Sequence, residues 1–113
     1  MTVAELKELD CGSKANPRFG DQKLVPGEPL VTLFEFFEFI EKHRVAHPEA
    51  KAVRFNIEIK VDEHFTEQEL KLAAKTMVDT LTAAHMVSRT TVQSFRLEVL
   101  PMVTRLNPQL VTS

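Results

Sequence analysis

The residues of this chain that are best placed for chemistry lie in the run Arg54-Phe55-Asn56-Ile57-Glu58-Ile59-Lys60-Val61. Apolar side chains alternate there with polar ones, which is typical of a β-strand with two chemically different faces. The polar face carries an amide, a carboxylate and an ammonium, and Glu58 and Lys60 are neighbours on it near the end of the strand. Such a face is either the solvated side of an edge strand or the lining of a site. The elements on either side of the strand have to decide between these interpretations.

The other reactive side chains of the chain do not form a recognisable site. The four histidines have no close second ligand at metal-binding spacing, and we expect them to be solvated. His43 and His85 fall near the ends of predicted helices, where a cationic side chain offsets the helix dipole. Cys11 is the only cysteine, so an internal disulfide is excluded, and no basic neighbour marks its thiol as reactive.

The composition bounds the class of protein. The chain has 113 residues, 43% of them hydrophobic and 27% charged, with a net charge of −2, as expected for one soluble globular domain. No basic patch for nucleic acid and no membrane span is visible. No signal peptide is present, so we expect a cytoplasmic location for the chain as it stands, with a periplasmic or secreted location open for a longer parent. The oligomeric state is not predicted.

Residues 1–31 are predicted to form a short helix followed by a long loop. The helix is expected over residues 2–9, and Cys11-Gly12-Ser13 ends it. The stretch from there to Pro29 holds all three glycines and three of the six prolines, which indicates a series of turns. A loop of this length in a small domain is usually functional, or a sign that the chain is part of something larger.

Residues 32–113 are predicted to alternate helices with strands. Thr32 and Glu35 form a capping box that begins the first helix, which contains four of the eight phenylalanines. Their distribution predicts that more than one face of this helix is buried. A second capping box follows the central strand and begins an amphipathic helix of about 19 residues.

The C-terminal part of the chain continues this alternation. Residues 90–95 are predicted to form a strand and residues 96–106 a helix, with Leu97, Leu100 and Val103 facing inward. Pro101 should bend this helix or delay its start. A third strand begins at Leu110. The order helix, strand, helix, strand, helix, strand predicts an α/β fold with parallel strands.

This fold class bears on the polar face of the central strand. Charged side chains cannot be buried beneath a helix without partners except at a large cost in free energy. The inside of a (β/α) barrel, near the carboxyl ends of its strands, accommodates them. The fold class therefore favours the site interpretation of Asn56, Glu58 and Lys60.

Four segments of the chain resemble the glycerophosphodiester phosphodiesterase family, whose members are metal-dependent (β/α)8 barrels. Residues 56–60, Asn-Ile-Glu-Ile-Lys, resemble the family's N-I-E-[IL]-K strand. Residues 2–12 resemble its T-x-x-E-L-k-x-L-D-x-G segment, residues 25–33 its P-G-x-x-I-P-T-L-E-E run, and residues 91–95 its v-x-[IV]-Q-S-F-D strand. Three residues depart from the usual pattern: Val31, Phe34 and Arg96. The segments have the family's order and intervals, so the resemblance extends over nearly the whole chain.

The resemblance implies roles for four residues. Glu58 matches a carboxylate that binds a divalent cation, calcium or magnesium, and Lys60 matches a lysine that reaches the substrate phosphate. Residues two apart on a strand point the same way, so one side chain can hold the cation while the other meets phosphate oxygens. Ser94 and Phe95 match the end of the next strand, where they are expected to contact the substrate, although a packing role for Phe95 is an equal alternative.

The implied reaction is the hydrolysis of a glycerophosphodiester to glycerol 3-phosphate and an alcohol, a step of lipid and glycerol metabolism. The family's catalytic histidines and most of its metal ligands have no counterpart here, so no catalytic residue is predicted. Residues 1–113 are therefore predicted to be a partial phosphodiesterase domain of about three βα units, an incomplete barrel that is inactive and does not hold the metal alone. The alternative is a non-catalytic α/β module that pairs through its open sheet edges with another chain.

Overall fold

The computed structural model describes all 113 residues and contains a three-stranded parallel sheet. The strands are β1 (Phe55–Glu58), β2 (Thr90–Gln93) and β3 (Val111–Thr112), in the order β1-β2-β3. Helix α3 (Glu67–Ala83) links β1 to β2, and α4 (Val99–Leu106) links β2 to β3. The helices α1 (Val3–Lys7) and α2 (Leu33–Ala46) and the 3-10 helix η1 (Pro48–Ala52) precede β1, and a second 3-10 helix, η2 (Val87–Arg89), precedes β2. The predicted α/β class with parallel strands is confirmed.

Each of the first three α-helices begins at a capping box that is visible in the sequence. Thr2, Thr32 and Thr66 each accept a hydrogen bond from the backbone of a glutamate three residues on, and that glutamate bonds back to the backbone of the threonine. These reciprocal bonds satisfy amides that the first turn leaves free. At the other end of α3, His85 has φ of 56°, the left-handed conformation in which helices commonly end.

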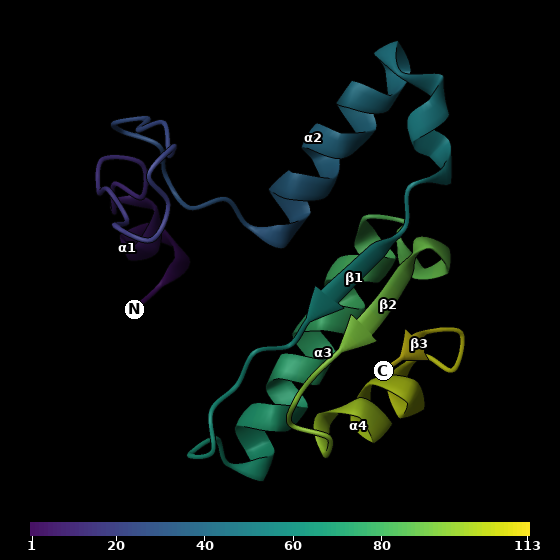
Figure 1. Cartoon of the computed structure of the whole chain (residues 1–113). Helices are drawn as coiled ribbons and strands as arrows, with labels where there is room; N and C mark the ends of the chain where they lie inside the picture. Colours follow the sequence, from purple (N-terminus) through teal and green to yellow (C-terminus); the bar gives the residue numbers. More distant parts are fainter.

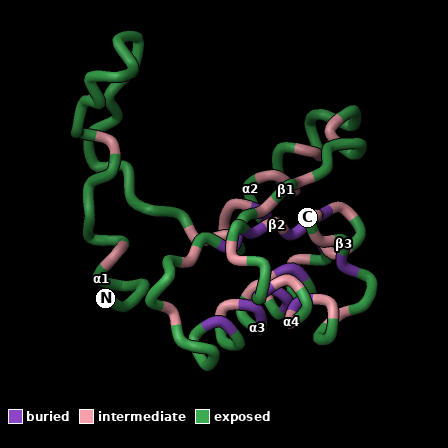
Figure 2. The backbone as a smooth tube through the Cα atoms, turned by 60° about the horizontal axis from the view of Figure 1, so that its bottom comes forward, coloured by how far each residue is buried: buried purple, intermediate pink, exposed green.

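The core lies between the sheet and the helices α3 and α4 (Figure 2). Val92 of β2, Leu81 of α3 and Val103 of α4 are all fully buried. Both crossover helices therefore cover the same face of the sheet, and the opposite face has no helix over it. The remaining buried apolar residues complete this cluster: Phe37, Ile59, Leu70, Ala74, Val78, Met86, Val99 and Leu110.

Helix α2 touches this core through one side only. Phe37 is buried, and its ring lies edge-on to Phe55 of β1 at a centroid distance of 5.4 Å. Phe34 and Phe39 are 42% and 65% exposed. The prediction that more than one face of this helix is buried is therefore wrong, because Phe34 is only partly covered and Phe39 stacks only on His43 of the same helix.

Arg89 fastens α2 and η1 to the amino-terminal end of the sheet. Its guanidinium forms an ion pair with Glu41 of α2 at 2.9 Å and donates hydrogen bonds to the carbonyls of Ala50 and Val53. The same group lies 5.3 Å from the ring centre of Phe55. This end of a parallel sheet usually serves stability rather than chemistry.

The last helix starts later than the sequence predicts. Helix α4 begins at Val99, not at residue 96, and Pro101 lies in its first turn, where a missing N–H costs no helical hydrogen bond. Residues 95–98 form a bend and a turn instead, and Leu97, expected to face inward, is 67% exposed. The delay expected from Pro101 is observed, and it removes Leu97 from the helix.

Residues 1–31 stand apart from the rest of the chain and hold no buried residue (Figures 1 and 2). The predicted long loop is closed on itself: the Cys11 amide donates to the Glu28 carbonyl at 2.9 Å, and the Val25 amide to the Gly12 carbonyl at 3.0 Å. Pro26 and Gly27, with φ of +82° at the glycine, form the tight turn between these bonds. The radius of gyration is 16.1 Å, against about 13 Å for a compact domain of this length.

Candidate functional site

The face of the sheet that lacks a helix carries the polar residues of β1. Exposure alternates along the strand and beyond it: Asn56, Glu58 and Lys60 are exposed, whereas Ile59 is 6% exposed. The strand ladder continues past Glu58, because the Ile59 amide donates to the Gln93 carbonyl at 2.8 Å. Lys60 therefore lies at the carboxyl end of the sheet on the same face as Glu58.

The register of the sheet brings a residue of β2 beside this pair. Glu58 is opposite Gln93, and Asn56 is opposite Thr91. In-register neighbours of a parallel sheet point to the same face, so the Gln93 amide joins the carboxylate and the ammonium. Gln93 was not among the predicted site residues. The signal that identifies it is the period of two along β2, counted from the buried Val92.

Ser94 does not lie on this face. Its side chain is buried on the helix side, where the hydroxyl donates to the Ile59 carbonyl at 2.8 Å and accepts a bond from the Arg96 amide at 3.1 Å. The hydroxyl thus joins the ends of β1 and β2 and starts the bend before α4. This geometry does not support the expected contact between Ser94 and the substrate. Ser94 follows Gln93, and adjacent residues of a strand point to opposite faces.

Phe95 follows at the carboxyl end of β2 and is 86% exposed. A packing role within this chain is therefore not observed, and the ring remains accessible beside the polar face. Of the predicted site residues, Glu58, Lys60 and Phe95 are exposed at the carboxyl end of the strands, and Ser94 is turned away from it.

Arg96, which occupies the place of an expected aspartate, links the two loops at this end of the sheet. Its guanidinium donates to the Asp62 carbonyl at 2.9 Å and pairs with Glu98 at 3.1 Å. The pKa of Glu98 is lowered by its own backbone amide and by this arginine. Arg96 therefore joins the loop after β1 to the loop after β2, the two segments that flank the exposed polar face.

The oxygen donors on this face do not suffice for a cation. Calcium takes six to eight oxygen ligands and magnesium six, with several waters in the magnesium shell. Here Glu58 is the one carboxylate on β1, and no group of three His, Cys, Asp or Glu residues anywhere in the chain is arranged to hold a metal ion. The residues present do not fit a complete metal site.

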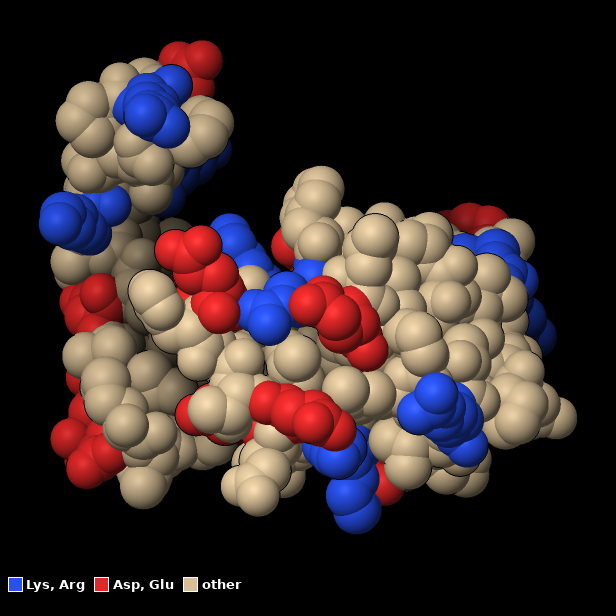
Figure 3. All heavy atoms as spheres, turned by 90° about the horizontal axis from the view of Figure 1, so that it is seen from below, with Lys and Arg blue, Asp and Glu red and all other residues tan.

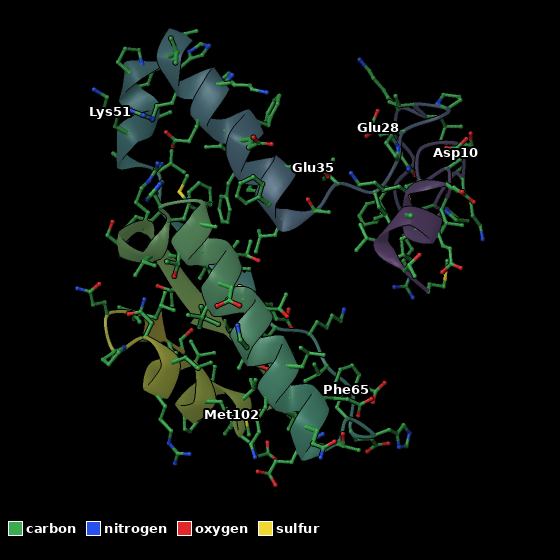
Figure 4. The ribbon with its side chains drawn as sticks, turned by 180° about the vertical axis from the view of Figure 1, so that it is seen from behind. Asp10, Glu28, Glu35, Lys51, Phe65 and Met102 are labelled. Carbon is green, nitrogen blue, oxygen red and sulfur yellow. The ribbon has the colours of Figure 1, made fainter.

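The two carboxyl groups with the largest pKa shifts lie far along the chain from this face. The pKa of Asp10 is lowered to about 2, mainly by the Ser13 hydroxyl, and that of Glu35 to about 2, mainly by Lys7 and then by Thr32. Figure 4 shows Asp10 within the segment 1–31 and Glu35 at the first turn of α2, facing that segment. These groups hold local structure and do not extend the candidate site.

The face of the molecule in Figure 3 shows no large region of one charge. In the view of Figure 3, acidic and basic side chains are interspersed, in keeping with 14 basic and 16 acidic residues. No helix is both long enough and apolar enough to cross a bilayer. Nothing on this face of the molecule resembles the basic stripe of a nucleic-acid-binding protein.

Comparison with solved structures finds a protein of similar fold, whereas comparison with sequences finds none. No family model and no curated protein matches the sequence. The chain superposes, over 100% of its length and with a TM-score of 0.85, on a crystal structure described as a "putative glycerophosphoryl diester phosphodiesterase" from Silicibacter pomeroyi DSS-3. The two chains are 24% identical.

The match shows how much of the solved protein's fold this chain contains. The chain spans 38% of the length of the solved protein, which is a TIM barrel, whereas the sheet of this chain has three strands and is open. The predicted incomplete barrel is thus confirmed at the level of fold. This chain has the fold of one part of an α/β barrel, a part found in a structure described as a phosphodiesterase.

Proposed function

We propose that this chain contributes one wall of the active site of a glycerophosphodiester phosphodiesterase. Glu58 supplies one oxygen ligand to a divalent cation, and Lys60 contacts the phosphate of the substrate. Gln93 and Phe95 border the same space, with the amide hydrogen bonding to the polar part of the substrate. The reaction is hydrolysis of the diester to glycerol 3-phosphate and an alcohol.

The observation that carries this proposal is the position of Glu58 and Lys60. They lie on one exposed face, at the carboxyl end of a parallel sheet, where α/β barrels place their chemistry. The similarity of residues 56–60 to the N-I-E-[IL]-K strand and the barrel-like fold support the same assignment.

The wall is incomplete, so the chain is not proposed to catalyse the reaction alone. One carboxylate leaves most positions around a hard cation to other ligands. General acid and base groups also have to come from residues outside this face, because it carries no histidine. We therefore expect no turnover of a chromogenic phosphodiester by the chain with calcium or magnesium. If the chain did hydrolyse the diester, and if Glu58→Ala abolished that hydrolysis, the expectation of an inactive chain would be contradicted.

The positive part of the proposal is tested by binding. Amide resonances of the isotopically labelled chain are followed while glycerol 3-phosphate is added in the presence of calcium. We expect shifts confined to residues 56–60 and 93–96, with a dissociation constant of about 1 mM or weaker, because few groups hold the ligand.

Two variants provide the comparison. Lys60→Met should remove the shifts, whereas Lys51→Met, at the opposite end of the sheet, should leave them unchanged. Shifts that cluster on the helices, or that persist in Lys60→Met, would contradict the proposed phosphate contact.

A further inference from the structure

The backbone at Lys60 lies just beyond the last bond of the sheet. The ladder between β1 and β2 ends where the Ile59 amide donates to the Gln93 carbonyl at 2.8 Å. Neither Lys60 nor Val61 takes part in a backbone–backbone hydrogen bond. In the loop that follows, Val61 and Phe65 pack against the core, and only in part. Because such a segment is ordinarily more mobile than a strand, the position of Lys60 depends on bonds from side chains.

Two side chains from the segment after β2 hold the backbone on either side of Lys60. The buried Ser94 hydroxyl donates to the Ile59 carbonyl at 2.8 Å, immediately before Lys60. The Arg96 guanidinium donates to the Asp62 carbonyl at 2.9 Å, shortly after it. The Arg96 amide also donates to the Ser94 hydroxyl at 3.1 Å. The two side chains therefore form one connected unit, the Ser94–Arg96 bridge.

The charge of Arg96 is used within the chain, whereas the charge of Lys60 is not. The Arg96 side chain is 26% exposed, and its Nε atom pairs with Glu98 at 3.1 Å while Nη1 reaches the Asp62 carbonyl. Hydrogen bonds from a charged donor are stronger than neutral ones, so this contact is well suited to hold a loop. Lys60 is exposed and takes part in no ion pair. Its ammonium group is the one left available for a ligand.

We propose that Ser94 and Arg96 are positioning residues for the proposed reaction: they fix the backbone at Lys60 and so hold its ammonium group toward the substrate phosphate. The contact between Lys60 and phosphate rests on the proposed function. Ser94 thus acts through Lys60 and not by touching the substrate. An ionised aspartate at position 96 could not replace Arg96, because a carboxylate has no hydrogen to donate to the Asp62 carbonyl.

The ligand-free chain tests the bridge by itself. Relaxation of the amide nitrogens gives an order parameter for each residue, and we expect about 0.85 for Lys60 in the unaltered chain. Arg96→Met keeps a long side chain and removes the donor, so it should lower the Lys60 value to about 0.6 and leave α3 and α4 unchanged. Arg105→Met is the matched control, because Arg105 is exposed on α4 and takes part in no ion pair. It should change none of these values.

Binding of glycerol 3-phosphate in the presence of calcium tests the consequence for the site. Arg96→Met should weaken binding about fivefold, because the ligand then has to order the backbone at Lys60. Arg96→Lys keeps a charged donor for the Asp62 carbonyl and should recover most of the lost affinity. Ser94→Ala removes the other part of the bridge and should weaken binding by a similar factor. This second variant decides the matter if Arg96→Met does not fold.

The two measurements together separate the bridge from the proposed function. A lower Lys60 order parameter together with weaker binding would support the bridge. Weaker binding with an unchanged order parameter would overturn it, because Arg96 would then act on the ligand through its charge alone. Unchanged order at Lys60 in both Arg96→Met and Ser94→Ala would overturn it as well. If the unaltered chain did not bind glycerol 3-phosphate, yet the order at Lys60 still depended on Arg96, the proposed function would fail and the bridge would stand.

Discussion

In residues 1–31 the chain is held by backbone hydrogen bonds and exposed polar side chains, whereas in residues 32–113 it is held by a buried core. The first region has no buried residue; in the second, helices α3 and α4 cover one face of the sheet. The one ion pair that joins the two regions is between Lys7 and Glu35, both partly exposed. The polar face with Glu58 and Lys60 belongs to the region with the core, so its geometry is set by packing.

This difference predicts that the two regions respond differently to the same changes. Loss of a buried apolar contact should destabilise the whole unit of residues 32–113. Changes in residues 1–31 should remain local, because little apolar surface depends on them.

The largest effect is expected for Leu81→Ala. Leu81 is fully buried in α3, and removal of such a side chain costs about 2–5 kcal/mol of the free energy of unfolding. Leu72→Ala on the same helix, where the side chain is 65% exposed, and Leu24→Ala in the first region should each cost about 0.5 kcal/mol or less. Chemical denaturation measures all three, and equal losses would remove the distinction between the regions.

A stabilising change is expected at Thr90. Its hydroxyl is buried against the helices and has no hydrogen-bond partner, which is unfavourable because the group lost its water on folding. Thr90→Val should raise the free energy of unfolding by about 1 kcal/mol. Thr91→Val, on the exposed face, is the control and should have a smaller effect. A destabilised Thr90→Val variant would indicate that the hydroxyl does find a partner.

Gly12→Ala should disrupt the first region alone. A Cβ at this position would lie 1.7 Å from the Val25 carbonyl oxygen, so the loop has to open. Gly20→Ala is the matched control, because its Cβ would meet no atom within 4 Å. Hydrogen exchange should show faster exchange of the Val25 and Cys11 amides in Gly12→Ala only. An accompanying loss of protection in α3 would show that the regions are coupled.

The smallest effect is a pH dependence at the junction of the regions. The pKa of Glu35 is lowered from 4.5 to about 2. The contribution of this carboxylate to the free energy of unfolding is therefore complete above a pH of about 4.5 and is lost as the pH falls toward about 2. Lys7→Met should bring the Glu35 pKa closer to 4.5, and Lys14→Met should not change it. Carboxyl-carbon resonances followed through an acid titration measure this, and an unchanged Glu35 pKa in Lys7→Met would exclude the ion pair.

Much of the second region is predictable from local sequence. The capping boxes locate the starts of α2 and α3, and the alternation along residues 54–61 identifies which side chains of β1 share a face. The position of the polar face opposite the helices follows from the α/β order. These features depend on residues close together in the chain, and the physical rules for them are local.

The structure differs from the sequence predictions in two situations. In one, the burial of a side chain depends on which elements pack against it; in the other, the alternation of faces along a strand was not applied to every residue. The exposure of Phe34 and Phe39 reflects which elements pack against α2, and no local pattern contains that information. The resemblance places Ser94 beside Phe95 at the substrate, although the period of two puts Ser94 on the face opposite to that of Gln93. The same rule identifies Gln93. The closure of the loop by bonds from Cys11 and Val25 is a tertiary feature with no signal in composition.

The proposal that Glu58 and Lys60 form one wall of a phosphodiesterase site is tested most directly by a graft. The part of the Silicibacter pomeroyi protein that superposes on this chain is replaced by residues 1–113, and hydrolysis of a glycerophosphodiester is compared with that of the unaltered host. Grafting residues 54–61 alone keeps the test available if the larger chimera does not fold. Glu63→Gln, an exposed carboxylate in the loop after β1, is the control.

We expect the graft to be active, Glu58→Gln to lower its kcat/KM by about 100-fold or more, and Glu63→Gln to have no effect. A graft whose activity survives Glu58→Gln would contradict the assignment of this face to the active site.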